Sequence, residues 1–215
     1  VGSTITAIAI LTDAYGSSDT QSAVITIANT NPTVLTSASI SAAPSPITGG
    51  LLTCSASFTD FNDGSLPTSY TWTHAGSTIG SGSTYLINAN SVSPTDTISC
   101  EASATDNNGS TASSVASVTV DNTNPSVNSV TISPSTTYVD STIVCTYIAT
   151  DVDSGESQSA GYMWSRNGTL EGGTSSTYNG ALSVGDTLTC TVSVTDNFGG
   201  TDSGSATVTV DNRSP

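Results

Sequence analysis

Apolar and polar residues alternate in short runs along most of the chain, and turn residues separate the runs. A period of two residues is typical of half-buried strands in an antiparallel sandwich. In the C-terminal part we predict strands near 127–133, 141–150, 160–166, 176–182, 186–195 and 203–210. Asn167-Gly168, which lies between apolar residues, predicts a tight hairpin turn. No segment of about a dozen residues carries a helical stripe, so the sequence predicts an all-β protein.

The chain repeats itself with a period of about 90 residues. The segment TVDNTNP at 119–125 recurs as TVDNRSP at 209–215 and, in weaker form, as TIANTNP at 26–32. Further matches between the two complete units are Cys54 with Cys145, Trp72 with Trp164, Tyr85 with Tyr178 and Cys100 with Cys190. The first 34 residues align with the last third of a unit, with Ala7 at the position of Cys100. We therefore predict complete domains at 35–125 and 126–215, preceded at 1–34 by the C-terminal strand hairpin of an incomplete domain.

The spacing of Cys and Trp narrows the fold class. In each complete unit a Trp follows the first Cys by 18 or 19 residues, and a second Cys follows about 45 residues after the first. This spacing resembles the Cys, Trp, Cys framework of immunoglobulin-like domains. Ile98 and Leu188 stand where antibody domains carry the Tyr of the tyrosine corner, so the resemblance is one of architecture. The Tyr-x-Trp motifs at 70–72 and 162–164, with the Thr-Asp loops, more closely resemble tandem immunoglobulin-like and cadherin-like repeats of giant prokaryotic surface proteins.

This resemblance implies tandem immunoglobulin-like antiparallel β-sandwiches. Together with the matched Cys pairs, it implies bridges Cys54–Cys100 and Cys145–Cys190, one between the two sheets of each complete sandwich. A metal site at these Cys residues is disfavoured, because they lack Cys-x-x-Cys spacing and the single His, His74, lies elsewhere. Disulfides persist outside reducing compartments, so we expect an extracellular, cell-surface or secreted protein.

Composition and charge exclude several classes of function. The formal net charge is −15 with only 2 Lys+Arg residues, which excludes nucleic-acid binding and disfavours anionic membrane surfaces. No apolar run approaches the length of a membrane span. The chain begins without Met or a signal peptide, so we expect it to be part of a processed or longer polypeptide. His74 is replaced by Arg166 in the next unit and the many Ser residues have no base, so we expect no enzymatic activity.

Acidic and amide residues cluster at the predicted domain junctions, where two loops of a sandwich meet the incoming linker. Oxygen ligands from several loops are what Ca²⁺ requires. The linker resembles the joint of cadherins, where Ca²⁺ stiffens neighbouring domains, although it is shorter and carries fewer acids. Candidate ligands at the second junction are Asp121, Asn122, Asn124, Asp151, Asp153, Glu156 and Asp196. Those at the first junction are Asn31, Asp60, Asp63 and Asp106, with Asn29, Asn62, Asn107 and Asn108 nearby.

Two observations qualify the calcium hypothesis. Ala28 replaces the linker Asp at the first junction, so that site is expected to be weaker or absent. Asp, Asn and Gly are also ordinary turn residues, and an acidic surface by itself keeps a protein soluble. Three Asn-x-Ser/Thr sequons also lie in predicted turns, at Asn108, Asn167 and Asn212, and are candidate glycosylation sites.

The sequence favours a structural role over a catalytic one. We expect a repeat segment of a surface stalk, adhesin or filament whose partners are flanking repeats or neighbouring copies. One alternative is a module that binds surface glycans or proteins through Phe61 or Phe198, because Trp72 and Trp164 are explained by packing on the disulfides.

The other alternative is a filament subunit assembled by donor-strand exchange through residues 1–34. An isolated hairpin is marginal in water, so this one requires a covering sheet, supplied upstream in the chain or by a neighbouring molecule. We expect one apolar face, formed by Ile5, Ile8, Ile10, Val24 and Ile27.

Overall fold

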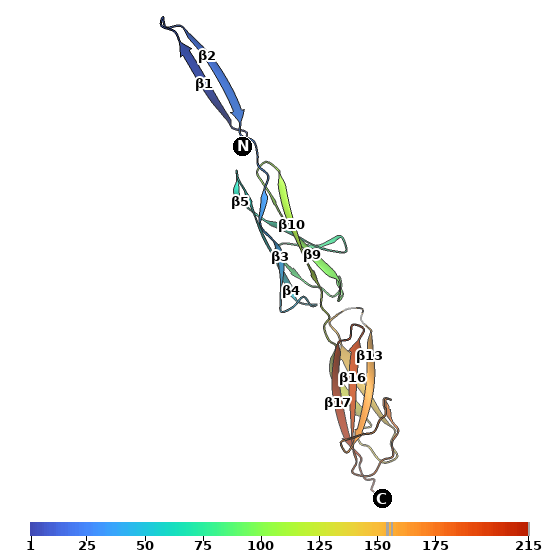
Figure 1. Cartoon of the computed structure of the whole chain (residues 1–215). Helices are drawn as coiled ribbons and strands as arrows, with labels where there is room; N and C mark the ends of the chain where they lie inside the picture. The colour runs from blue at the N-terminus through green and yellow to red at the C-terminus, as the bar shows by residue number, and fades with distance from the viewer. Residues whose placement is uncertain (154, 156, 215) are drawn as a thin grey trace. The chain divides into compact units, whose positions relative to one another are not determined.

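The computed structural model describes residues 1–153, 155 and 157–214, and the described residues form strands and loops without a helix (Figure 1). Contacts group the chain into two compact units. The first comprises Val1–Ala42, Leu52–Tyr85 and Thr97–Val118, and the second comprises Ala43–Leu51, Leu86–Asp96 and Thr119–Pro215. The predicted domain boundaries after residues 34 and 125 remain a prediction.

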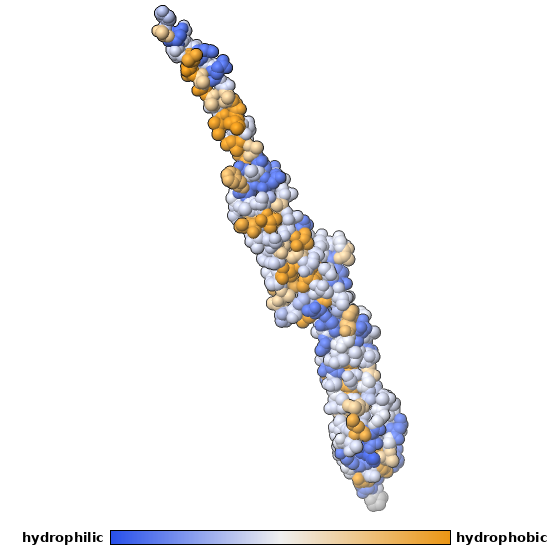
Figure 2. Space-filling model, viewed as in Figure 1, coloured by the Kyte–Doolittle hydropathy of each residue, from blue (hydrophilic) through white to orange (hydrophobic). Residues whose placement is uncertain are grey.

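The first unit begins with a two-stranded antiparallel hairpin of β1 (Thr4–Thr12) and β2 (Ser18–Thr26). Every residue of both strands is exposed, and Figure 2 shows hydrophobic residues along the hairpin. The predicted single apolar face is wrong. The register pairs Ile5 with Ile25 on one face, whereas Ile8, Ile10 and Val24 lie on the other, because side chains alternate between faces. Both faces therefore carry apolar side chains.

The first complete sandwich has two sheets. One has the order β10-β9-β6-β7, with bounds Thr111–Thr119, Thr97–Thr105, Ser69–His74 and Ser77–Ser81. The other contains β3 (Thr33–Ala43), β4 (Leu51–Asp60) and β5 (Gly64–Leu66), and β8 (Thr84–Leu86) also pairs with β4. In the first of these sheets, β6 pairs antiparallel with both β7 and β9. This arrangement is an immunoglobulin-like sandwich.

The second sandwich repeats that strand order, except that no strand among the described residues corresponds to β5. One sheet is β14-β13-β16-β17, with bounds Thr169–Leu170, Gln158–Arg166, Thr187–Asp196 and Thr201–Thr209. The other is β11-β12-β15, with bounds Ser126–Ser133, Ile143–Thr150 and Thr177–Tyr178. The predicted strand at 176–182 is wrong beyond Tyr178. At Gly180 the backbone turns past the Tyr178 ring so closely that a Cβ there would lie 2.3 Å from the Tyr178 hydroxyl oxygen.

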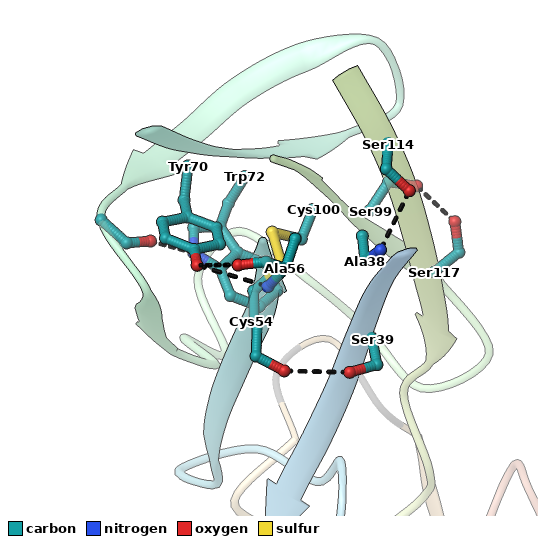
Figure 3. The surroundings of a disulfide bond; sticks show 12 residues. Ala38, Ser39, Cys54, Ala56, Tyr70, Trp72, Ser99, Cys100, Ser114 and Ser117 are labelled. Atoms are coloured by element: carbon teal, nitrogen blue, oxygen red, sulfur yellow. Dashed lines mark hydrogen bonds between the residues drawn. A yellow bond between two sulfur atoms is a disulfide. The ribbon is translucent and has the colours of Figure 1, made fainter. Parts of the chain in front are cut away.

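Each sandwich has a core built on its disulfide. Cys54 bonds Cys100, and Cys145 bonds Cys190, as predicted. Each bridge joins the two sheets, and Trp72 lies opposite Cys100 (Figure 3). Trp164 lies opposite Cys190 in the same way. Both Trp side chains are buried. In the chain-entropy model, closing a loop of this length contributes about 4 kcal/mol to stability.

Hydroxyl groups pair across the outer faces of the sheets. Ser39 and Ser55 lie with their Oγ atoms 3.0 Å apart, and Ser99 and Ser117 lie 2.8 Å apart (Figure 3). The second sandwich has the same kind of pairs, Thr131 with Thr146 and Thr189 with Thr207. These cross-strand pairs explain how a chain so rich in Ser and Thr maintains its sheets.

Candidate functional site

The first linker is hydrogen-bonded to two loops of the sandwich that follows it. We call this arrangement the first joint, and it comprises Asn29, Thr30, Asp60, Asn62 and Asp106. Asn29 Nδ2 donates to Asp106 Oδ2 at 2.9 Å, and the Thr30 N–H donates to Asn62 Oδ1 at 2.8 Å. The Thr30 hydroxyl lies within hydrogen-bond distance of both Asp60 oxygens and of Asn62 Oδ1. All of these residues belong to the first unit.

The second joint repeats this design within the second unit. It comprises Asn122, Thr123, Asp151, Asp153 and Asp196. Asn122 Nδ2 donates to Asp196 Oδ2 at 2.9 Å, and the Thr123 N–H donates to Asp153 Oδ2 at 2.8 Å. The Asp153 N–H donates to Asp151 Oδ1, just as Asn62 N–H donates to Asp60 Oδ1 in the first joint.

The Thr48 hydroxyl, also in the second unit, donates to Asp153 Oδ1. Asp153 and Asp196 are 4% and 5% exposed. Hydrogen bonds from neutral donors therefore offset the cost of burying these two carboxylates.

The two joints differ in which oxygens lack a partner. In the first joint the Thr30 hydroxyl contacts Asp60, but the matching atoms of the second joint, Thr123 Oγ1 and Asp151 Oδ2, are buried without a hydrogen-bond partner among the described residues. The amide oxygens Asn29 Oδ1 and Asn122 Oδ1 are in the same situation. The second joint therefore holds three such oxygens and the first holds one.

A carboxylate at the end of a β-strand organises each joint. Asp106 Oδ1 accepts the N–H groups of Asn108 and Ser110 at 2.8 Å, and Asp196 Oδ1 accepts those of Phe198 and Gly200 at 2.8 Å. The Asn29 side chain, helped by these backbone donors, lowers the pKa of Asp106 despite the opposing effect of burial. Burial raises the pKa of Asp196, but the hydrogen bonds from Asn122 and the loop outweigh it and leave that pKa lowered. Both groups are therefore held ionised.

The tip of the exposed hairpin contains the same turn. Asp13 Oδ1 accepts the N–H groups of Tyr15 and Ser17 at 2.8 and 2.9 Å. Asp13 follows β1 as Asp106 follows β9, in agreement with the alignment of the first 34 residues on the end of a repeat. No linker Asn contacts Asp13 in the described part of the chain.

The structure brings together only part of the predicted calcium ligand set. Asp121 and Asn31 are exposed, and Asp63 accepts the side chain of Asn107 at 2.7 Å. Asn124 is also exposed, but its Oδ1 lies beside Gly200 next to the side chains of Asp196 and Asn122. Glu156 lies outside the described residues. Within the described residues, no group of three or more His, Cys, Asp or Glu side chains is arranged to hold a metal ion.

Sequence reasoning missed the part played by Thr30, Thr123 and Thr48. The recurrence of Asn-Thr-Asn-Pro in both linkers was the signal that could have found the first two.

The remaining candidates are on the surface. Asn108, Asn167 and Asn212 are exposed, which is compatible with glycosylation. Asn167 Nδ2 nevertheless donates to Asp186 Oδ1 at 2.8 Å, so a glycan there would compete with a structural contact. Phe61 is 92% exposed and Phe198 is 42% exposed. Across the described residues, we find no helix with the length and hydropathy needed to cross a membrane.

Comparison with known proteins gives weak similarity to modular proteins. No family model matches the chain, and no curated protein matches it. Fibronectin(III)-like modules of Clostridium thermocellum CbhA are 17% identical over 81% of this chain and 94% of theirs, with a TM-score of 0.29. Cadherin domains 1–5 of protocadherin gamma B2 are 11% identical over 99% of this chain and 46% of theirs, with a TM-score of 0.38. The chain thus spans about half of that cadherin fragment.

Three N-terminal domains of the outer capsid protein Hoc of bacteriophage RB49 are 10% identical over 97% of this chain and 89% of theirs, with a TM-score of 0.34. Similarity this low assigns the chain to no family. The class of tandem immunoglobulin-like sandwiches is defined by the strand order and the two disulfides.

Asn122→Ala tests the organising carboxylate of the second joint. The variant removes one donor from an ionised, nearly buried Asp196, so we expect the free energy of unfolding at neutral pH to fall by about 1 to 3 kcal/mol. Chemical denaturation measures this change. Because the folded pKa of Asp196 is lowered, its stabilisation is present above the ordinary Asp value of 3.8 and is lost as pH falls through the folded value. The difference between variant and wild type should therefore shrink at low pH.

Asn197→Ala is the matched control, because Asn197 is exposed in the same loop. Equal losses in the two variants, or a loss that persists when Asp196 is protonated, would contradict this role for Asn122.

Proposed function

We propose that the chain is a structural repeat segment of an extracellular stalk, adhesin or filament, of the kind built by giant prokaryotic surface proteins. The observation that carries the proposal is the recurrence of one joint. In both linkers an Asn side chain and the following Thr N–H donate to loop oxygens of the next sandwich. A linker held at two points has less freedom than a flexible tether, which suits a protein that transmits position along an array of domains.

The other features support the same role. Each complete sandwich has its own disulfide, and disulfides persist in oxidising surroundings outside the cytosol. Flanking repeats are the partners that such a segment requires. The similar solved structures also contain several consecutive modules, although their similarity is too low to carry the argument.

Label-distance measurements test the restrained linker. We attach spin labels to exposed sites on the two sandwiches of the full chain and measure the distance distribution across the second joint. The wild type should give a narrow distribution. Replacing Asn122 and Thr123 by Gly should broaden it, because the Asn122 side-chain donor is lost and glycine increases the conformational freedom of the backbone whose N–H donates to Asp153. Replacing the exposed residues Thr201 and Ser203 by Gly is the control, because it tests whether a general loss of stability alone broadens the distribution. A wild-type distribution as broad as that of the Gly variant would contradict the proposal.

Calcium stiffening of the second joint is a further element of this proposal. The three buried oxygens without partners, Asn122 Oδ1, Thr123 Oγ1 and Asp151 Oδ2, are hard ligands of the type that Ca²⁺ takes. Their neighbours Asp153 and Asp196 are already satisfied by neutral donors, so Ca²⁺ is not required to offset charge repulsion. When bound, the ion would supply a positive charge and be coordinated by those unpartnered oxygens.

Isothermal titration of the full chain with CaCl₂ tests this element. We expect saturable binding that Asp151→Asn weakens at least tenfold, because the change removes an anionic ligand. Asp60→Asn, the matched change in the first joint, should leave that binding intact. If millimolar calcium gives no saturable heat, the acidic loops serve turn formation and solubility only.

Filament assembly through the hairpin is the second candidate function. By the repeat alignment, Ile5, Ala7, Ala9 and Leu11 correspond to Ile98, Cys100, Ala102 and Ala104, which are buried in the first sandwich. In the hairpin this face is exposed, with Ile5 at 57% and Leu11 at 78%. A complementary sheet of the same repeat type would cover it, supplied upstream in cis or by a neighbouring molecule.

Sedimentation velocity over a range of concentrations tests assembly in trans. Strand exchange predicts association that Leu11→Asp abolishes, because Leu11 lies on the face that matches a sandwich core. Ile10 lies on the opposite face, so Ile10→Asp should have a smaller effect. If the full chain stays monomeric at all concentrations, strand exchange in trans is contradicted. The covering sheet would then have to be supplied in cis.

A further inference from the structure

The exposed hairpin has a second apolar face, for which a covering sheet gives no explanation. We call it the outer face, and it consists of the even-numbered residues of β1 and β2. Its apolar members are Ile8, Ile10 and Val24, which are 62%, 66% and 62% exposed. They form one patch, because Val24 is opposite Thr6 and therefore lies diagonally across from Ile8. Figure 2 shows hydrophobic residues along the hairpin.

The same face is polar in both complete sandwiches. Alignment of β1 and β2 with the last two strands of each sandwich identifies the residues at the three apolar positions. They are Glu101, Ser103 and Ser117 in the first sandwich and Thr191, Ser193 and Thr207 in the second. The buried residues of β9 and β16, among them Cys100 and Cys190, alternate with these positions and point to the core. The core of a sandwich therefore does not require apolar residues on the outer face.

Completion of the hairpin by a sheet leaves the outer face exposed. A sheet of the same repeat type would contact the face that carries Ile5 and Leu11, because these residues correspond to the buried Ile98 and Ala104. Successive side chains of a strand point to opposite faces, so the outer face stays open whether that sheet lies in cis or in trans. Neighbouring apolar side chains that remain exposed on a folded surface indicate an interaction site.

Charge selects the partner of this face. The outer face contains no ionisable residue, although the chain has a formal net charge of −15. Asp19, the single acidic residue within the two strands, is opposite Leu11 and so lies on the other face. Two copies of the chain repel one another over most of their surface, and this neutral face is where they can approach. A charged partner, in contrast, would find no side chain here with which to form an ion pair.

The outer face is also complementary to itself. Its apolar patch lies in the middle of the hairpin, and Thr and Ser occupy the outer-face positions at both ends of each strand. A two-fold axis through the patch would place apolar residues on apolar residues and hydroxyl groups on hydroxyl groups. Such a contact is a sheet-on-sheet packing, which needs flat faces without charge at the centre.

We propose that the outer face of the hairpin binds the same face of a second copy, so that two chains associate side by side at this repeat. The polar outer faces of the complete sandwiches do not form this contact, so the hairpin alone fixes where neighbouring chains meet. The contact uses the face opposite to that of strand exchange, and none of the joint residues takes part. It therefore stands independently of the restrained linker, of calcium and of strand exchange.

Sedimentation equilibrium of the full chain at submillimolar concentration tests this pairing. We measure it in Leu11→Asp, which removes strand exchange through the other face, and expect dimers to persist. Adding Ile8→Thr, Ile10→Thr and Val24→Thr gives the face the polarity of the complete sandwiches and keeps β-branched side chains suited to a strand. This triple change should weaken the dimers at least about tenfold. Raising the NaCl concentration should strengthen the dimers of Leu11→Asp, because salt screens the repulsion between two acidic chains.

Val115→Thr in the same background is the matched control, because Val115 is 59% exposed on β10 of the first sandwich. It should leave the dimers unchanged. The amide shifts of Tyr15 and Ser17, whose N–H groups donate to Asp13, show whether the hairpin stays folded in the triple variant. If these shifts are lost, the single changes Ile10→Thr and Val24→Thr decide the question by the same measurement.

Two results would overturn the proposal. One is a Leu11→Asp chain that remains monomeric at every concentration, because the outer face is intact in that variant. The other is a folded outer-face variant that dimerises as strongly as its parent. Neither result bears on strand exchange, which is judged from the difference between Leu11→Asp and the wild type.

Discussion

The ionised carboxylate that follows the penultimate strand of each repeat is the interaction on which the joints depend. One oxygen of Asp106 or Asp196 receives two backbone N–H groups and so fixes the turn between the last two strands. The other oxygen receives the amide of a linker Asn located 77 or 74 residues earlier in the chain. A single side chain thus connects the end of a sandwich's sequence to its beginning. Charge strengthens every one of these hydrogen bonds, because the acceptor is an anion with little exposure to water.

The sandwiches have few large apolar side chains, and covalent and polar contacts compensate. Hydrophobic residues make up 35% of the chain, and many core positions hold Ala, Val or Cys. A disulfide in each complete sandwich limits the entropy of the unfolded chain, and one Trp packs beside each bridge. On the outer faces, Ser and Thr hydroxyls pair with one another across strands. Ion pairs could not serve this purpose throughout the sheets, because the chain has only 2 Lys+Arg residues.

The sequence was sufficient to predict the fold class but only part of the candidate site. Strand alternation and the internal repeat predicted the all-β class, and the matched Cys pairs predicted both bridges, since these features are properties of the chain itself. The hairpin face was assigned wrongly because a list of apolar residues does not reveal which ones share a face when both faces are apolar, as Ile5 and Ile8 illustrate. At the linkers, the sequence pattern led to Asp and Asn being interpreted as metal ligands, whereas Asn29 and Asn122 donate to Asp106 and Asp196 in the structure. Whether an Asn amide is a donor or a ligand depends on side-chain orientation, which spacing alone does not specify.

The comparison of matched atoms shows how two near-identical repeats diverge in chemistry. Asn62 in the first joint becomes Asp153 in the second, so the second joint has three carboxylates where the first has two. The Thr30 hydroxyl contacts its carboxylate, whereas Thr123 Oγ1 and Asp151 Oδ2 remain without partners among the described residues. The fold is preserved between the repeats, and among the described residues the second joint holds more unsatisfied oxygens than the first. Such atoms are where a repeat can acquire a ligand.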